Sequence, residues 1–308
     1  MRGERGFVLV ITLVVTALLV ALATEFIHEV FVATSHRKSF SEAQQASLLA
    51  DSGVKGGIRL LQETQKVQEY TSLLDRWARP LAWEDETGSV TVTIENEEGK
   101  FPLNVLVTPA GTPDDWYFGI AVRLFRKTGV SPDLVEGIAD WIDADDEPRP
   151  AGGEAVFYAS FLPPYAPANA PLQTVDELGL VKGVAGKPLD QLRPFVTVYS
   201  DAPWAPTAKI NINTASRELL ASLDERMTDE LAGRVIDHRR KAPFKSTTEL
   251  LKVPGMETIG QALQFRVRVK GAVFRIHSLA KAGETTRIIE AVARIDGSQA
   301  TVLYWREY

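Results

Sequence analysis

An uncharged apolar run near the start constrains this 308-residue chain more than any other feature. Residues 7–24 read FVLVITLVVTALLVALAT and contain no Asp, Glu, Lys or Arg. As a helix, this run would extend about 27 Å, close to the thickness of the hydrocarbon core of a bilayer. Arg2 and Arg5 precede it with one acid, Glu4, and this positive excess places that end in the cytoplasm. The run therefore predicts one membrane-spanning helix with the rest of the chain outside.

A secretory signal peptide is the competing interpretation, because small residues at the end of the run offer a cleavage site. After Thr24, however, the sequence continues EFIHEVF without a turn signal, and apolar and small residues recur at helical spacing as far as Leu61. We therefore expect one helix of roughly fifty residues, against a globular average of about 11 to 12. Its membrane part is residues 7–24, its amphipathic part is residues 25–62, and residues 1–6 form a leader.

The second half of the chain changes from helical to strand patterns. Alternating segments at residues 272–280, 287–295 and 301–306 are joined by Gly turns and predict an antiparallel meander. An alternating strand at residues 89–95 can join the same sheet and pack on the long helix. The predicted fold class is α+β, with a long N-terminal helix packed on an antiparallel sheet and a large inserted α-helical domain. The core comprises residues 63–108 plus 268–308, and the insertion comprises residues 109–267.

The finer pattern predicts the elements inside these domains. We expect a helix over 62–79, extended chain over 100–106, a long Pro- and Gly-rich loop over 143–170, and a helix that Asn213 or Thr214 caps. Further helices are expected over 114–127, 131–142 with Ser131 as N-cap, 228–240, 246–251 and 257–265.

Composition argues against several functions. The formal net charge of -6 disfavours broad binding of nucleic acid or anionic membranes by the soluble part. The chain has no cysteine, which excludes disulfides and thiol catalysis. Its four histidines carry no catalytic motif, and the neighbouring acids Asp145 and Asp146 are adjacent in sequence, an arrangement that rarely converges on one substrate. We therefore predict that the chain is not an enzyme.

The acidic loop is the best candidate for site chemistry. Asp143, Asp145, Glu147 and Glu154 occupy the first, third, fifth and twelfth places of a twelve-residue window, which is the acidic spacing of a calcium loop. Pro148 stands where an EF-hand needs Gly, and no second EF-hand helix is evident, so we reject that fold. Clustered carboxylates without His or Cys still favour Ca²⁺ as a structural ion. A solvated acidic turn is the alternative.

Residues 213–256 look like a helix-hairpin-helix DNA-binding module, with LLKVPGM at residues 250–256 as its hairpin. Glu257, however, stands where such modules carry the Gly whose amide reaches phosphate. A basic cluster follows the pattern of a solvated helix end and consists of Arg234, His238, Arg239, Arg240 and Lys241. We expect the hairpin to be a packing scaffold and no nucleic acid to bind, with a membrane-anchored competence-type DNA-binding protein as the alternative function.

Separated motifs give the chain a family resemblance. A basic leader ending in Gly6, an aromatic Phe7 and a long apolar helix resemble the start of type IV pilins and type II secretion pseudopilins. Further segments resemble the minor pseudopilin K family of the type II secretion system, namely DWIDADD at 140–146, PRP at 148–150, EAVFY at 154–158, NAPL at 169–172 and ININTA at 210–215. The resemblance implies cleavage between Gly6 and Phe7 by a prepilin peptidase and methylation of the new amine. It also suggests bound Ca²⁺.

One position departs from the common pilin pattern. Most of that family carry Glu as the fifth mature residue, and here that position is Ile11. A carboxylate in hydrocarbon needs a compensating partner such as the amine of a neighbouring subunit. A subunit without it has nothing to offer a subunit ahead, so Ile11 indicates a tip position.

The resemblance also implies a setting for the chain. Its expected partners are the minor pseudopilins of I and J type, the major pseudopilin, the prepilin peptidase and the inner-membrane assembly platform. The expected location is the bacterial inner membrane, single-pass, with a cytoplasmic N-terminus and a periplasmic globular domain. The expected function is to prime and cap a pseudopilus for protein export. A generic single-pass anchored binding module remains a further alternative.

Overall fold

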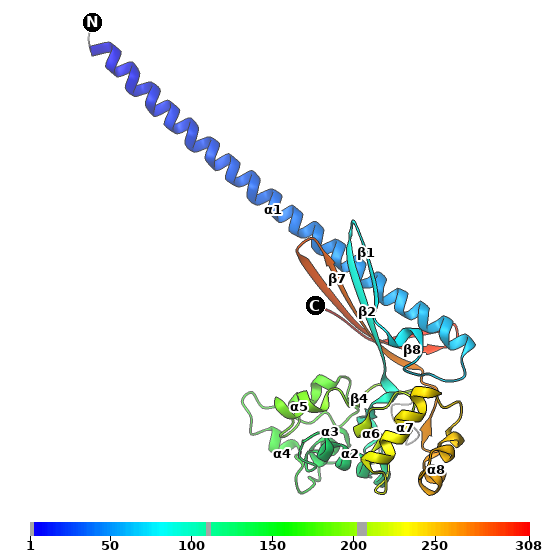
Figure 1. The fold of residues 1–308 in the computed structure, drawn as a ribbon. Coiled ribbons are helices and arrows are strands. Elements are labelled where there is room, and N and C mark those ends of the chain that lie inside the picture. Colours follow the sequence, from blue (N-terminus) through cyan, green and yellow to red (C-terminus); the bar gives the residue numbers. More distant parts are fainter. Residues whose placement is uncertain (1–2, 109–111, 202–207) are drawn as a thin grey trace.

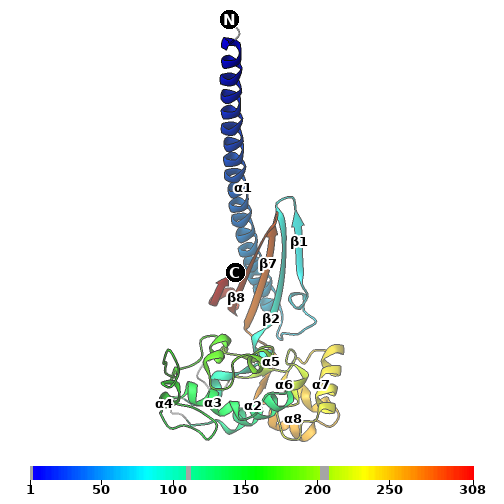
Figure 2. The same ribbon diagram turned by 90° about the vertical axis from the view of Figure 1, so that its left-hand side faces the viewer.

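The computed structural model describes residues 3–108, 112–201 and 208–308. The long helix α1 (Gly3–Val67) dominates it, and its 65 residues extend about 98 Å (Figure 1). The sheet covers only the second half of α1, and the helical domain lies beyond the end of the sheet that faces away from the N-terminus (Figure 2). The predicted fold class is confirmed, with a long helix, an antiparallel sheet and an inserted helical domain.

The helix ends at Val67 rather than at residue 62. No helix breaker follows Leu61, and Glu63 pairs with both Arg59 and Lys66 on the last turns. The predicted helix over 62–79 is wrong beyond this point, because only Arg76–Ala78 (η1) forms a short 3₁₀ turn. The buried Asp75 carboxylate accepts hydrogen bonds from the Ser72 backbone and from the indole of Trp77, which holds an irregular loop instead.

The sheet has the strand order β1-β2-β7-β8-β9, and every neighbouring pair is antiparallel. Its strands are β1 (Leu81–Asp85), β2 (Gly88–Asn96), β7 (Val273–Ala282), β8 (Thr285–Asp296) and β9 (Gln299–Glu307). The sequence did not predict β1, since LAWED lacks a clear alternation and all but its first residue are exposed. By pairing with β7, strand β2 joins the first half of the chain to the meander of β7, β8 and β9, which begins about 180 residues later.

One face of α1 packs on this sheet. Ala46, Ala50, Val54 and Leu61 recur at helical spacing and are fully buried, and the last three share a core with the strands. The amphipathic part of the helix was predicted to begin at residue 25, but Phe26, Val30 and Phe40 are exposed. The amphipathic pattern is thus covered within this chain only from about residue 43 onward.

The helical domain has its own hydrophobic core. Its elements are η2 (Glu97–Gly99), β3 (Phe101–Pro102), η3 (Leu103–Val105), α2 (Asp115–Lys127), α3 (Leu134–Ile142), α4 (Ala155–Tyr158), η4 (Val175–Leu180), α5 (Lys187–Leu192), β4 (Val196–Thr197), β5 (Ile210–Asn211), α6 (Arg217–Leu220), α7 (Asp229–Lys241), η5 (Thr247–Lys252), α8 (Glu257–Leu263) and β6 (Val267–Arg268). Phe101, Leu103 and Val105 belong to its core, so the chain leaves the sheet at Asn96 rather than at residue 108. The extended segment predicted over 100–106 is a two-residue strand followed by a 3₁₀ turn.

Two predicted helix starts are also corrected. Residues 131–133 form turns, and α3 begins at Leu134 rather than after Ser131. The cap of α6 is Ser216, whose side chain accepts from the Leu219 amide at 3.1 Å. Asn213 instead donates its amide to the Phe244 carbonyl, and Thr214 donates its hydroxyl to Asn96. Both polar side chains link segments and leave the cap to Ser216.

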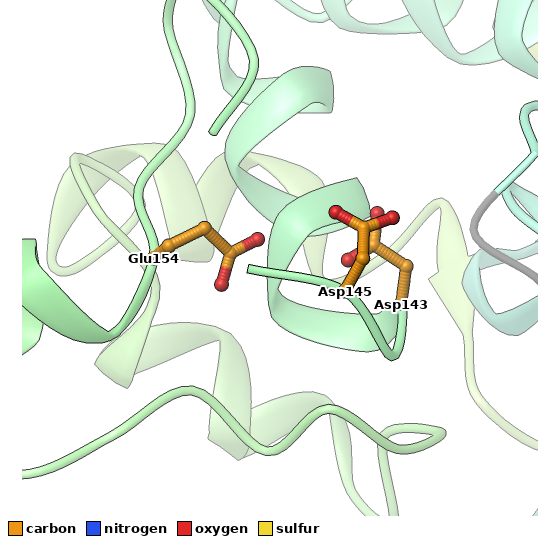
Figure 3. Close-up of side chains that lie close together, drawn as sticks. All are labelled: Asp143, Asp145 and Glu154. Atoms are coloured by element: carbon orange, nitrogen blue, oxygen red, sulfur yellow. The ribbon is translucent and has the colours of Figure 1, made fainter. Parts of the chain in front are cut away.

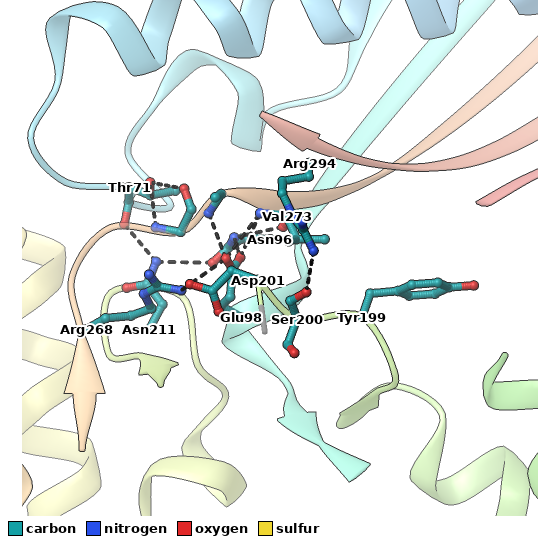
Figure 4. Close-up of polar contacts among 12 residues, drawn as sticks. Thr71, Asn96, Glu98, Tyr199, Ser200, Asp201, Asn211, Arg268, Val273 and Arg294 are labelled. Atoms are coloured by element: carbon teal, nitrogen blue, oxygen red, sulfur yellow. Dashed lines mark hydrogen bonds and ion pairs between the residues drawn. The ribbon is translucent and has the colours of Figure 1, made fainter. Parts of the chain in front are cut away.

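A buried polar network joins the helical domain to the sheet (Figure 4). The Asn211 side-chain amide donates to the side-chain oxygen Oδ1 of Asn96 at 3.1 Å, and the Asn96 side-chain amide donates to the Glu98 carboxylate at 2.6 Å. Glu98 also accepts from the backbone amides of Ala272 and Val273 at the start of β7. The network therefore contacts both chain crossings between the two domains.

Candidate functional site

Three of the four carboxylates predicted as ligands in the acidic loop lie close together. Asp143 follows the last turn of α3, Asp145 lies on the turn after it, and Glu154 precedes α4. One ligand oxygen from each of the three lies within 4.8 Å of the others. The Glu154 carboxylate faces those of Asp143 and Asp145 across a small gap (Figure 3).

Glu147 does not belong to this group. Its backbone amide donates to the Asp145 carboxylate at 2.9 Å, which tightens the turn and leaves its own side chain exposed. The spacing of a calcium loop predicted Glu147, the fifth residue of the window, as a ligand. The backbone departs from an EF-hand at the next residue, Pro148, and the Glu147 side chain therefore does not join the other carboxylates.

Arg149 neutralises part of the acidic charge. Its guanidinium nitrogen Nη1 lies 2.5 Å from Asp140 Oδ1 and 2.5 Å from Asp143 Oδ2. Its backbone amide also donates to Asp140 Oδ2 at 3.0 Å. Asp140 is completely buried on α3, so this bidentate arrangement fixes the loop to the helix. The sequence pattern did not predict a role for Asp140 or Arg149, although Asp140 lies about one helical turn before Asp143 and Arg149 lies in the same loop.

Glu154 is the least satisfied acid of the group. Its side chain is 4% exposed, and neither carboxylate oxygen has a hydrogen-bond partner among the described residues. Asp143 Oδ1 is also buried and has no hydrogen-bond partner among the described residues. Burial, and then repulsion by Asp140 and Asp143, raise the pKa of Glu154 to about 8. Such uncompensated buried oxygens are costly without a cation or proton.

Aromatic packing and a lysine hold the rest of the loop. Tyr158 packs edge-on against Trp141 at a ring-centroid distance of 5.2 Å and receives the backbone N–H of Lys182 on its hydroxyl. The Lys182 ammonium donates to the Gly152 carbonyl at 2.5 Å and lies over the Phe157 ring. This long loop is therefore fixed by side chains, as its length suggested.

The arrangement suits a hard cation better than acid-base catalysis. Its donors are carboxylate oxygens, and within the described residues no histidine belongs to the group. Ca²⁺ prefers such ligands and tolerates irregular geometry. Asn169, in the same loop, has a buried side-chain oxygen without a partner among the described residues, and its backbone amide donates to the Trp141 carbonyl.

The apolar segment at the start lies apart from both domains. Within the described residues, the structure has one helix that is long and apolar enough to cross a membrane, Phe7–Val67, and its apolar window is not buried at all. Phe7 and Ile11 are both exposed on it. Gly6 lies within the backbone of α1.

The hairpin at residues 250–256 packs as a scaffold. Leu250, Val253 and Met256 are buried in the core of the helical domain. The Gly255 amide donates to the Glu257 carboxylate at 3.2 Å, so a negative charge occupies the place where a phosphate would bind in a DNA-binding hairpin. The geometry gives the DNA-binding alternative no support.

The fold is pilin-like, and the exposed apolar helix fits a single-pass membrane anchor. Two models of the family described as type II secretion system (T2SS), protein K match the chain over residues 99–201 and 210–269, just over half of its length. The chain belongs to this family, and its role is that of a minor pseudopilin in type II secretion.

Individual relatives agree. Type II secretion system protein K of Pseudomonas aeruginosa is 29% identical over 270 residues, covering 82% of this chain and 77% of that protein. The Aeromonas hydrophila protein of the same description is 23% identical over 320 residues, covering 94% of this chain and 93% of that protein. A chain of the crystal structure of the GspK-GspI-GspJ complex from enterotoxigenic Escherichia coli has the same fold, with a TM-score of 0.75 and 21% identity over 89% of this chain and 99% of that one.

Proposed function

We propose that this chain occupies the tip of the pseudopilus, where it primes and caps assembly without enzymatic activity. The observation that supports the tip position is Ile11, an uncharged residue on the exposed apolar part of α1 where most pilins carry Glu. A carboxylate at this depth compensates the amine of the subunit ahead, and this chain offers none. The large helical domain at the opposite end of α1 then forms the head of the fibre.

The partners follow from the same position. The structural relative was crystallised in a GspK-GspI-GspJ complex, which supports minor pseudopilins of I and J type as the neighbours of this chain. Residues 7–41 of α1 are exposed, with no cover from the described residues, and they are the surface for these partners and for the major pseudopilin. We place the anchor in the bacterial inner membrane, with the head in the periplasm, and the prepilin peptidase and assembly platform on the membrane side.

Mass spectrometry of the N-terminus tests the processing step. In cells that contain the prepilin peptidase, we expect the chain to begin at methylated Phe7, and in cells without it the leader should remain. A chain cleaved after Ala23 or nearby would instead be a secreted protein. An intact N-terminus in both strains would make it an ordinary anchored protein.

The tip position itself needs a separate measurement. Antibodies against the head should label pseudopili at one end only, because a subunit that cannot receive another ahead of it ends the fibre. Label distributed along the shaft would contradict the tip position while leaving the family unchanged.

We also propose that Asp143, Asp145 and Glu154 hold a structural Ca²⁺ ion. The unsatisfied buried oxygens of Glu154 and Asp143 support it, since a divalent cation would compensate both. When bound, the ion would supply positive charge that ties α4 to the end of α3. Arg149 would then hold Asp140 and one oxygen of Asp143, which leaves the other oxygen for the ion.

Thermal unfolding of the full-length protein in detergent, with and without Ca²⁺, tests this site. Ca²⁺ should raise the melting temperature, and Glu154→Gln should abolish most of the rise because it removes a charged ligand. Glu147→Gln is the matched control, since its exposed side chain lies outside the group, and should keep the full rise. An equal loss in both variants, or no rise in the unaltered protein, would rule out a Ca²⁺ site at these three residues.

A further inference from the structure

A cleft with basic walls lies on the side of the molecule where the loop after α1 meets the helical domain. It consists of two adjoining cavities of about 480 and 470 Å³ that share Leu73 and Arg239. The basic residues that line it are Arg79, Lys100, Arg217, Arg239 and Arg240. Among the described residues of the lining, Glu95 is the one acid, and its carboxylate is already paired with Lys100 at 2.8 Å.

Arg239 is the residue that gives the cleft a chemical preference. It is 8% exposed on α7, and one guanidinium nitrogen donates to the Ile212 carbonyl at 2.6 Å. Among the described residues, no carboxylate forms an ion pair with it, although Asp237 approaches the neighbouring Arg240 at 3.8 Å. Burial and the charge of Arg240 lower the pKa of Arg239 to about 10. A buried guanidinium without a counter-charge, lining both cavities, favours an anionic ligand.

Apolar side chains share the rest of the lining with polar ones, namely Thr93, Asn96, Asn213, Thr214 and Ser216. Leu73 and Leu74 are each 50% exposed at the mouth, and Trp77 lines the interior. Exposed leucines beside a buried arginine suit a ligand that carries both carboxylate and apolar side chains. Along α1 the cleft lies about 65 Å beyond the end of the apolar segment, which is too far for a lipid headgroup of the anchoring membrane.

We propose that this cleft binds an acidic, apolar peptide segment of a partner protein, with a carboxylate on Arg239 and an aliphatic side chain against Leu73 and Leu74. Arg217 and Arg240 at the exposed rim attract the segment and set its direction. A peptide fits better than a nucleic acid, because Arg239 is buried beside apolar side chains, whereas binding of a phosphate backbone relies on a row of exposed basic residues. The proposal does not depend on the tip position or on Ca²⁺.

Fluorescence anisotropy with the full-length protein in neutral detergent tests the proposal. The probe is a short labelled peptide of alternating glutamate and leucine, and its lysine-leucine counterpart is the control ligand. We expect the acidic peptide to bind and the basic one not to bind. The double variant Arg217→Glu, Arg240→Glu should weaken binding about tenfold or more, because it reverses two charges at the rim.

A second double variant separates the cleft from general charge. Arg126→Glu with Arg234→Glu changes the net charge by the same amount at exposed positions that do not line the cleft, and should change the affinity less than about twofold. Arg239→Lys, which keeps the charge but loses the fork of donors, should weaken binding while the protein stays folded by circular dichroism. Equal weakening by both doubles would overturn the proposal. Displacement of the peptide by an oligothymidylate or by inorganic phosphate would assign the cleft to phosphate and overturn it as well.

Discussion

In the acidic loop, the buried carboxylate of Asp140 determines which residue can occupy position 152. Asp140 is fully buried and receives two hydrogen bonds from Arg149, one from the side chain and one from the backbone. The backbone of Gly152 lies directly against the Asp140 carboxylate, where a Cβ atom would overlap it. The loop therefore needs glycine at position 152 because its backbone lies so close to the Asp140 side chain, and not because of an unusual φ angle.

Gly152→Ala should destabilise the head. The added methyl group would push Asp140 away from Arg149, and we expect a loss of about 1 to 3 kcal/mol, as in other overpacked sites. Gly179→Ala is the control, because its methyl group would make only ordinary contact with Leu189. Chemical denaturation followed by tryptophan fluorescence measures both. Equal stability of the two variants would show that the loop can move aside.

At the scale of elements, α1 approaches the sheet through glycines. A Cβ at Gly53 would collide with Ser278, Val90 and Val92, and one at Gly57 would be tight against Ile276. Gly56 lies between them on the same helix and would meet nothing within 4 Å. The two glycines that face the strands let helix and sheet pack closely, whereas Gly56 faces outward.

This difference predicts opposite effects of one substitution. Gly56→Ala should stabilise the protein by roughly 0.5 to 1 kcal/mol, because alanine is the better helix former. Gly53→Ala gains the same propensity but forces the helix away from β2 and β7, so we expect a net loss of about 1 to 3 kcal/mol. Thermal unfolding by circular dichroism compares the two. A stabilised Gly53→Ala protein would contradict close packing of α1 on the sheet.

The elements that the sequence predicts well are those with a local signal. The apolar run, the buried spacing at Ala46, Ala50 and Val54, and the alternating strand around β8 need no distant partner to be recognised. β1 is exposed and short, and its pairing with β2 gives it no pattern of its own. For the acidic loop, residue spacing brought Asp143, Asp145 and Glu154 to attention, but Arg149 and Asp140 depend on how the loop folds back.

At the scale of the whole molecule, charged residues join the two domains. Glu97 directly follows β2 and is fully buried. Its carboxylate pairs with Arg275 on β7 at 3.0 Å and with Lys100 at 3.0 Å. Arg275 lies about 180 residues further along the chain, so the sequence could not show that this acid is inside. An acid is rarely buried without a partner, and this partner is distant in sequence. No local pattern therefore marks the junction, and residues 63–108 were predicted to belong to the sheet domain.

The pH dependence of stability follows from this pair. Burial alone would raise the pKa of Glu97, but attraction to Lys100 and Arg275 outweighs it and lowers the pKa to about 2. The folded-state pKa therefore lies below the unfolded value of about 4.5, so ionised Glu97 stabilises the fold above that pH. The contribution should be lost as the pH falls from about 4.5 toward about 2. Melting temperatures of the full-length protein in detergent across this window measure the loss.

Glu97→Gln should remove this part of the pH dependence and destabilise the protein at neutral pH by about 3 kcal/mol, because Arg275 and Lys100 lose a buried counter-charge. Glu95→Gln removes the exposed acid that pairs with the same Lys100, and should cost less than about 1 kcal/mol. Glu98 has the opposite effect on the pH dependence of stability. Burial raises its pKa, so its ionised form destabilises the fold and protonation at low pH removes that cost. The difference between the unaltered protein and Glu97→Gln isolates Glu97 from that effect. If the two melting curves ran parallel from neutral pH to about pH 2, the junction would not depend on the charge of Glu97.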